Sequence, residues 1–203
     1  MKEIIEKGIV AILPEYVKDI GNCTIIYTKD KNKIILNKTI RTILKNICSH
    51  YHLDVKAANK TYGEVLSVKR SPPIPFARDN IFINMKVRQP IHKDDGAHGY
   101  IKLDEISQIK RSKTSKQNTC VSLKNGLEIE ALNKPETINK KIKDGHIIRR
   151  LFDNNDSYFV REESLHQGKT TLATKSDLAL VYMGLMELKE SLEKALNRST
   201  SHL

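Results

Sequence analysis

The sequence predicts an α+β fold, in which antiparallel β-hairpins form the sheet, accompanied by a few amphipathic helices and an appended C-terminal helix. Short runs rich in β-branched residues are bounded by turn residues along most of the chain, as in hairpins. Apolar residues recur at helical spacing in only a few stretches. With 203 residues, the chain is long enough to bury a core without disulfides.

In the first part of the chain, the apolar run Gly8–Pro14 predicts a buried strand that ends at the proline. Two runs of β-branched residues around a polar turn predict a hairpin over 24–36. Isoleucines at helical spacing then predict an amphipathic helix that is capped by Asn37 or Thr39 and ends near His50.

The middle of the chain is punctuated by proline and glycine. Three prolines in 71–75 predict an extended segment that can join neither a helix nor a β-ladder. A strand is predicted over 81–85, and a polar loop over 89–99. Residues 100–109 predict a strand that contains a turn or a short helix.

A basic loop over 110–118 precedes the clearest hairpin, which spans 119–132 around Asn125-Gly126. A basic amphipathic helix follows Pro135 and reaches about Leu151. Farther on, apolar residues at alternating spacings of three and four predict a helix with an apolar seam. The seam comprises Leu178, Val181, Leu185, Leu188, Leu192 and Ala195. It is suited to packing on its own domain, to dimerisation or to docking of a partner.

The charge of the chain is uneven. Thirty-five Lys and Arg stand against 24 Asp and Glu, a net charge of +11. Residues 153–203 hold six basic and eight acidic residues, so residues 1–152 carry a net charge of +13. A domain this basic attracts polyanions, chiefly nucleic acid, by counterion release. A well-solvated lysine-rich surface and a membrane surface are the alternatives.

Sequence motifs for enzymes and metals are absent or weak. The chain has no phosphate-binding loop, dinucleotide fingerprint or nucleophile elbow. Cys48, His50 and His52 supply too few ligands for a structural zinc site. His92 with Asp94 and Asp95 could stage acid–base chemistry, although a polar loop explains them equally well. We therefore expect no metal, no cofactor and no enzymatic activity.

Three features of the sequence bear on the cellular location of the protein. No run of about 18 apolar residues is present, so we expect no membrane span. The acidic residues of the first seven positions argue against a signal peptide. Three scattered cysteines favour a reducing compartment. The predicted location is the cytoplasm, in association with the nucleoid.

The basic charge is better suited to duplex DNA than to single strands, because aromatic residues make up only 5% of the chain. A β-rich protein without a recognition helix can place cationic side chains in the minor groove of A/T-rich DNA. Five candidates for the minor groove or its phosphates are Lys69, Arg70, Arg78, Lys86 and Arg88. Four candidates for the DNA backbone are Lys110, Arg111, Lys113 and Lys116.

Several short motifs, in their order along the chain, resemble the competence transcription factor (ComK) family of Gram-positive bacteria. They include Thr61-Tyr62-Gly63-Glu64-Val65, Ser71-Pro72-Pro73-Ile74, Gly99-Tyr100-Ile101 and Asn125-Gly126-Leu127. The resemblance implies an activator of competence genes that recognises paired A/T-rich boxes through the minor groove as dimers that assemble further. It also implies contacts with RNA polymerase and turnover by an adaptor-delivered protease.

We therefore expect three parts: a basic α+β DNA-binding domain over 1–152, a polar linker over 153–172, and a C-terminal amphipathic helix within 173–203. The leading hypothesis is a sequence-specific transcriptional activator that binds double-stranded A/T-rich DNA as a homo-oligomer. The alternative is an interaction protein that does not bind DNA specifically. It would dimerise with, or sequester, a competence regulator through the seam.

Overall fold

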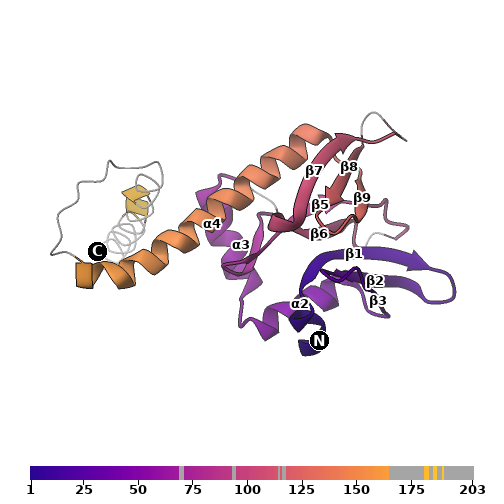
Figure 1. Ribbon diagram of the computed structural model, residues 1–203, viewed down its shortest axis with the longest axis horizontal. Helices are drawn as coiled ribbons and strands as arrows, with labels where there is room; N and C mark the ends of the chain where they lie inside the picture. Colours follow the sequence, from indigo (N-terminus) through magenta and orange to yellow (C-terminus); the bar gives the residue numbers. More distant parts are fainter. Residues whose placement is uncertain are drawn as a thin grey trace, which may run out of the picture. The chain divides into compact units, whose positions relative to one another are not determined.

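The computed structural model describes residues 1–68, 71–92, 95–113, 115, 118–164, 181–182, 185–186 and 189. The chain divides into two compact units, Met1–Arg149 and Arg150–Leu203. The first unit contains two antiparallel sheets and several helices, so the predicted α+β fold is confirmed (Figure 1). In the part of the chain that the structure describes, no helix is long and apolar enough to cross a membrane.

A six-stranded antiparallel sheet has the order β3-β2-β1-β6-β5-β4. Its strands are β1 (Ile9–Val17), β2 (Gly21–Thr28), β3 (Lys33–Leu36), β4 (Ile74–Ala77), β5 (Asn80–Lys86) and β6 (His98–Lys102). The hairpin predicted over 24–36 and the strand predicted over 81–85 are confirmed. The central ladder joins β1 to β6, where Ile12 pairs with Tyr100.

Two prolines lie inside strands, against expectation. Pro14 pairs with Thr24 in the middle of β1. The other neighbour of β1, β6, pairs only with residues that precede Pro14, so the missing N–H of this proline costs no ladder bond there. Pro75 pairs with Ile81 in β4, which is an edge strand and needs a partner on one side only. The predictions that Pro14 ends its strand and that 71–75 cannot join a ladder are therefore wrong.

The predicted helix near Ile43 is α2 (Ile40–His50), and Thr39 caps it by accepting a hydrogen bond from the backbone N–H of Thr42. Its apolar side packs into a core with the six-stranded sheet. Ile43 and Ile47 are fully buried in that core, beside Ile12.

Two helices were not expected, α1 (Lys2–Glu6) and α3 (Val55–Val65). Asp54 caps α3, because its Oδ1 accepts the backbone N–H of Lys56 at 2.8 Å. No residue of α3 is buried. Its few apolar residues, Val55, Ala58, Tyr62 and Val65, do recur at helical spacing, but this weak period was missed.

A three-stranded sheet follows the short 3-10 turn η1 (Leu103–Glu105). It comprises β7 (Ile106–Arg111), β8 (Thr119–Leu123) and β9 (Glu128–Ala131), in that order. The hairpin at Asn125-Gly126 is confirmed, with Gly126 at φ +84°. Lys110 and Arg111 belong to β7 and not to the predicted loop. Asn125 ties this sheet to the larger one through a 3.3 Å bond from its Nδ2 to the carbonyl oxygen of Thr28.

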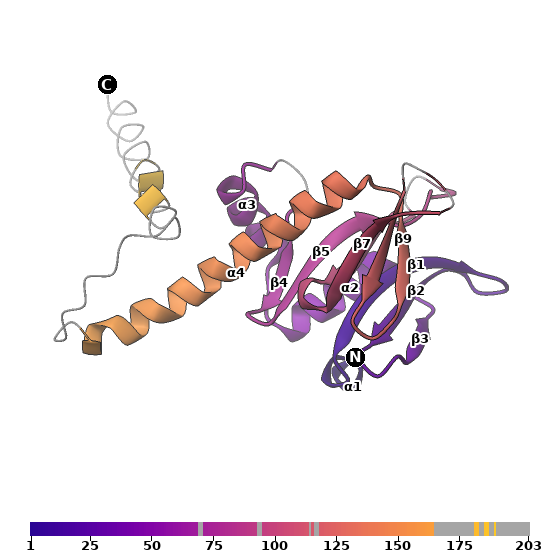
Figure 2. The same cartoon turned by 45° about the horizontal axis from the view of Figure 1, so that its top comes forward.

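The long helix α4 (Pro135–Ser164) lies beside β5 and η1 within the first unit (Figure 2). Gly145 allows this approach, since a Cβ there would lie 3.0 Å from Leu103 and 3.2 Å from Ile83. The linker expected over 153–172 is helical as far as Ser164. No glycine or proline interrupts the sequence from 153 to 164, so nothing in the backbone stops the helix there. The remainder of the expected linker lies outside the described residues.

The predicted C-terminal helix is described at five positions only, Val181, Tyr182, Leu185, Met186 and Lys189, all helical. Val181 and Leu185 belong to the predicted seam, and both are exposed. The other seam positions, Leu178, Leu188, Leu192 and Ala195, lie outside the described residues.

Candidate nucleic-acid interface

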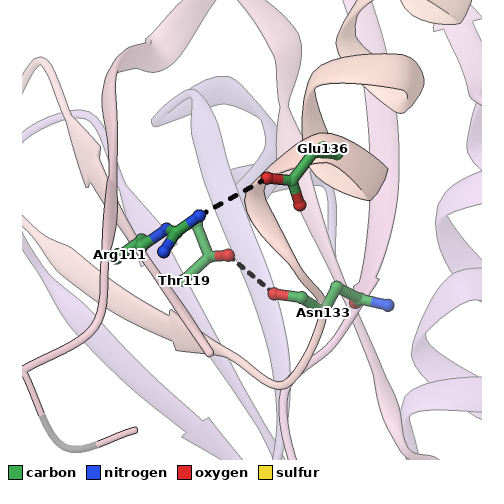
Figure 3. A network of polar contacts seen from close by, with 4 residues as sticks. All are labelled: Arg111, Thr119, Asn133 and Glu136. Carbon is green, nitrogen blue, oxygen red and sulfur yellow. Dashed lines mark hydrogen bonds and ion pairs between the residues drawn. The ribbon is translucent and has the colours of Figure 1, made fainter. Parts of the chain in front are cut away.

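The ends of several strands meet at one end of the six-stranded sheet. Lys86, the last residue of β5, pairs with His98, the first residue of β6. Asn133, which follows β9, accepts the backbone N–H of Lys86 with its Oδ1 at 2.6 Å. Its backbone oxygen accepts the Thr119 hydroxyl, also at 2.6 Å (Figure 3). Asn133 therefore holds the ends of β5, β8 and β9 close to the start of α4.

Cationic side chains gather around this junction, on the last residues of β5 and β7, at the start of β6 and in the first turns of α4. We call this surface the basic end; it comprises Lys86, His98, Lys110, Arg111, Lys113, Lys134, Lys140 and Lys141. Most of these side chains are exposed, while Lys86 and Lys141 are half-buried.

Lys141 anchors the basic end to the sheet. Its Nζ donates a hydrogen bond to Oδ1 of Asn84, a residue that is buried in β5. The Nδ2 of Asn84 donates in turn to the carbonyl oxygen of Ser71 at 3.1 Å. Burial lowers the pKa of Lys141, and the nearby Asp144 carboxylate opposes that shift. A polar Asn within an apolar strand was the sequence signal for this contact, and it was missed.

His98 reports the electrostatic character of the basic end. Partial burial lowers its pKa below the usual histidine value, and the positive charges of Lys141 and Lys86 lower it further. The two lysine charges disfavour protonation of the His98 imidazole, because a proton there would place a third positive charge beside them. The surface therefore has a surplus of positive potential, which suits an anionic ligand.

The Arg111 side chain remains accessible in the basic end. Its Nη2 lies 4.0 Å from Oε1 of Glu136, with the two side chains 70% and 72% exposed (Figure 3). A pair so exposed adds little to stability and can exchange one anionic partner for another. On β9, the far edge of the same sheet, Glu130 accepts hydrogen bonds from Ser112 and Asn118, both at 3.0 Å.

Of the nine predicted DNA-contacting residues, the structure brings together Lys86, Lys110, Arg111 and Lys113. Arg78 lies in the turn before β5, at the opposite end of that strand from Lys86. At about 3.3 Å per residue, the seven residues of β5 separate the two by roughly 20 Å. Three further candidates, Lys69, Arg70 and Lys116, lie outside the described residues.

The Arg88 side chain contacts other residues of the protein. Its Nε donates to the carbonyl oxygen of Gly96 and its Nη2 to Oδ1 of Asn22, both at 2.7 Å. The guanidinium also lies 4.0 Å from the centre of the Tyr16 ring. Because Asn22 and Tyr16 are 66 and 72 residues away from Arg88 in the chain, the sequence alone did not reveal these two partners. These contacts tie Arg88 to Gly96 and to the β1–β2 hairpin, and a DNA contact of Arg88 stays a prediction.

The weaker sequence candidates have structural explanations. Burial raises the pKa of Cys48 to about 11, so its thiol is poorly suited to bind a metal. The carboxylate of Asp95 accepts hydrogen bonds from Tyr16 and Asn22, which fix a loop. Asp94 lies outside the described residues. Among the residues that are described, no three His, Cys, Asp or Glu side chains group as a metal site would require.

The profile described as ComK protein matches residues 2–157. No curated protein and no solved structure gives a significant match. The matched range covers most of the chain and includes both sheets and the basic end. The chain therefore belongs to the ComK protein family, a family of competence transcription factors.

Proposed function

We propose that this protein is a sequence-specific, DNA-binding activator of competence genes that recognises A/T-rich boxes through the minor groove. The observation that carries the proposal is the basic end, a surplus of cations on one surface of a ComK-family domain. Duplex DNA offers closely spaced phosphates, and their neutralisation releases counterions. The minor groove of A-tracts is narrow and strongly negative, so it attracts lysine and arginine side chains.

The positions of the cations suggest a division of roles. In the proposal, Lys110, Arg111 and Lys113 hold phosphates from β7 and the loop that follows it, together with Lys116. Lys86 approaches the minor groove, together with Lys69 and Arg70, which precede the Asn84 partner Ser71 in the chain. Arg78 has no role in this proposal, because it lies far from Lys86 along β5. Arg88 has none either, because its guanidinium contacts other residues of the protein.

The first test is fluorescence anisotropy with two duplexes of equal length at about 0.15 M salt, one with paired A- and T-tracts and one G·C-rich. We expect a preference of about 100-fold or more for the A/T-rich duplex, since specific sites exceed non-specific ones by at least about 1000-fold in many systems. Equal and steeply salt-dependent binding to both duplexes would contradict sequence-specific recognition.

Acidification from pH 7.5 is expected to raise the affinity for the A/T-rich duplex by up to about fivefold once the pH falls below the pKa of His98, because the added proton supplies one more phosphate contact. The lowered pKa leaves His98 neutral at pH 7.5, and protonation on acidification adds a charge to the basic end. His98→Gln should abolish most of this rise in the same anisotropy titration. The control is His50→Gln, at the end of α2 away from the basic end, which should retain it. An unchanged pH profile in His98→Gln would exclude a contact at this position.

A second candidate function rests on Val181 and Leu185, whose apolar side chains are exposed on helical backbone. In this proposal the seam joins two copies of the chain, or joins the chain to another competence regulator. A protein that acts only in this way would bind both duplexes alike. The duplex comparison therefore separates the two functions.

A further inference from the structure

The loop between β5 and β6 carries Ile91, which is 69% exposed. Among the residues described, no other large apolar side chain is as exposed as this one. The preceding residue, Pro90, is exposed as well. An isolated apolar residue on a surface needs no explanation by itself, so the question is how the loop holds it.

The loop is fixed beneath Ile91 by a network of hydrogen bonds. The backbone N–H of Ile91 donates to the Tyr16 hydroxyl at 2.8 Å, and that hydroxyl donates to Oδ2 of Asp95 at 2.5 Å. The same carboxylate accepts the backbone N–H of His92 at 3.1 Å and the Nδ2 of Asn22 at 2.8 Å. Tyr16 and Asn22 belong to the β1–β2 hairpin, so the network ties the loop to that hairpin.

Two further contacts restrain the base of the loop. Arg88 stacks on Tyr16 and bonds to Gly96, as described above, so it closes the loop from one side. On the other side, Gly96 packs against the start of α2, where an added Cβ would lie only 2.5 Å from Cγ2 of Ile40. The described residues on either side of the tip, Arg88 to His92 and Asp95 to Gly96, are therefore restrained, and Ile91 is exposed on them.

The loop lies next to the basic end. Arg88 follows Lys86 by two residues, and His98 begins the strand on the other side of the loop. An apolar tip among cations matches a duplex, which has phosphates on its surface and apolar base faces inside.

We propose that Ile91, presented together with Pro90 by this restrained loop, inserts between two base pairs from the minor groove and kinks the DNA. Minor-groove proteins use Ile, Leu, Phe, Met and Pro as such wedges. Pyrimidine–purine steps of A/T-rich DNA are deformed most easily, so the wedge adds sequence preference without base-edge contacts. Because hydrogen bonds restrain the backbone N–H groups of Ile91 and His92 beforehand, insertion loses less conformational entropy than it would from a free segment. This inference rests on the proposed function.

The test measures bending and unstacking in full-length protein bound to an A/T-rich duplex. End-labelled DNA reports the bend by energy transfer, and a 2-aminopurine in the box reports unstacking. Ile91→Ala is expected to abolish both signals and to weaken binding about tenfold, with an unchanged dependence on salt. Ile35→Ala is the matched control, since Ile35 is also exposed, at 43%, but lies on β3. The control should behave like the unaltered protein.

A second variant tests the positioning of the loop. Tyr16→Phe keeps the ring beneath Arg88 but removes the hydroxyl that holds Ile91 and Asp95. We expect a partial loss of bending, with the thermal stability nearly unchanged.

The outcomes separate the wedge from the function on which it rests. A preference for the A/T-rich duplex without bending, or bending that persists in Ile91→Ala, would overturn the wedge and leave the function intact. A loss of oligomer mass in Ile91→Ala, with bending unchanged, would reassign the tip to a protein contact and also overturn the wedge. Equal binding to both duplexes would contradict the function itself.

Discussion

Reversing the charge of Lys110, Arg111 and Lys113 to glutamate is expected to lower affinity for an A/T-rich duplex by about 100- to 1000-fold at roughly 0.15 M salt. All three side chains are exposed in the basic end. The slope of log affinity against log salt concentration is negative, and each lost phosphate contact makes it less steep by about 0.9. The new carboxylates also repel the phosphates. Anisotropy titrations at several salt concentrations measure both the affinity and the slope.

The matched control reverses Lys29, Lys31 and Lys33, which are equally exposed and change the net charge by the same amount. They lie in the turn between β2 and β3 and at the first residue of β3, at the opposite end of the six-stranded sheet from the basic end. We expect this variant to lose less than about fivefold in affinity, because distant charges are screened at this salt concentration. Equal losses of affinity in the two variants would show that DNA is attracted by the net charge of the protein and not by the basic end.

The second large effect concerns the core that supports the sheet. Ile43→Ala is expected to lower the free energy of unfolding by about 2–5 kcal/mol. Ile43 is 0% exposed and packs between α2 and the six-stranded sheet, so its truncation loses buried apolar surface and leaves a cavity. Urea denaturation followed by circular dichroism measures the change.

Two control variants accompany this measurement. Ile43→Val, which removes one methylene, should cost only about 0.5–1.5 kcal/mol. Ile35→Ala, on the exposed side of β3, should change the free energy of unfolding by less than about 0.5 kcal/mol. Equal stability of Ile43→Ala and the unaltered protein would mean that α2 contributes nothing to the core.

Local signals account for the parts of the fold that the sequence predicted correctly. The Asn125-Gly126 turn and the isoleucine period of α2 act over a few residues, and both elements are confirmed. Whether a strand tolerates Pro14 depends on where a neighbouring strand ends, and that neighbour is far away in the chain. The position at which such a strand ends therefore depends on the order and length of its neighbours in the sheet, which a local sequence pattern does not reveal.

The candidate interface shows the same division between local and distant information. Clustered charge in the sequence pointed to Lys110, Arg111 and Lys113 as candidate DNA contacts. Such a prediction needs only local information, because a charged side chain stays at the surface without a partner from elsewhere in the chain. It could not distinguish Arg88, whose partner Asn22 comes from another hairpin. It also missed the bond between Lys141 and Asn84, which forms only when α4 lies beside β5.

The ladder between β1 and β6 constrains the order in which the protein can fold during synthesis. Ile12 and Tyr100 pair although about 90 residues separate them, and such distant pairings slow folding. The first three strands leave the ribosome well before β6 exists, with the inner edge of β1 still open. An open strand edge is a template for wrong pairing with other chains. Rapid expression should therefore favour aggregation of the nascent chain, and slower synthesis or chaperone binding to the open edge should increase the yield of folded protein.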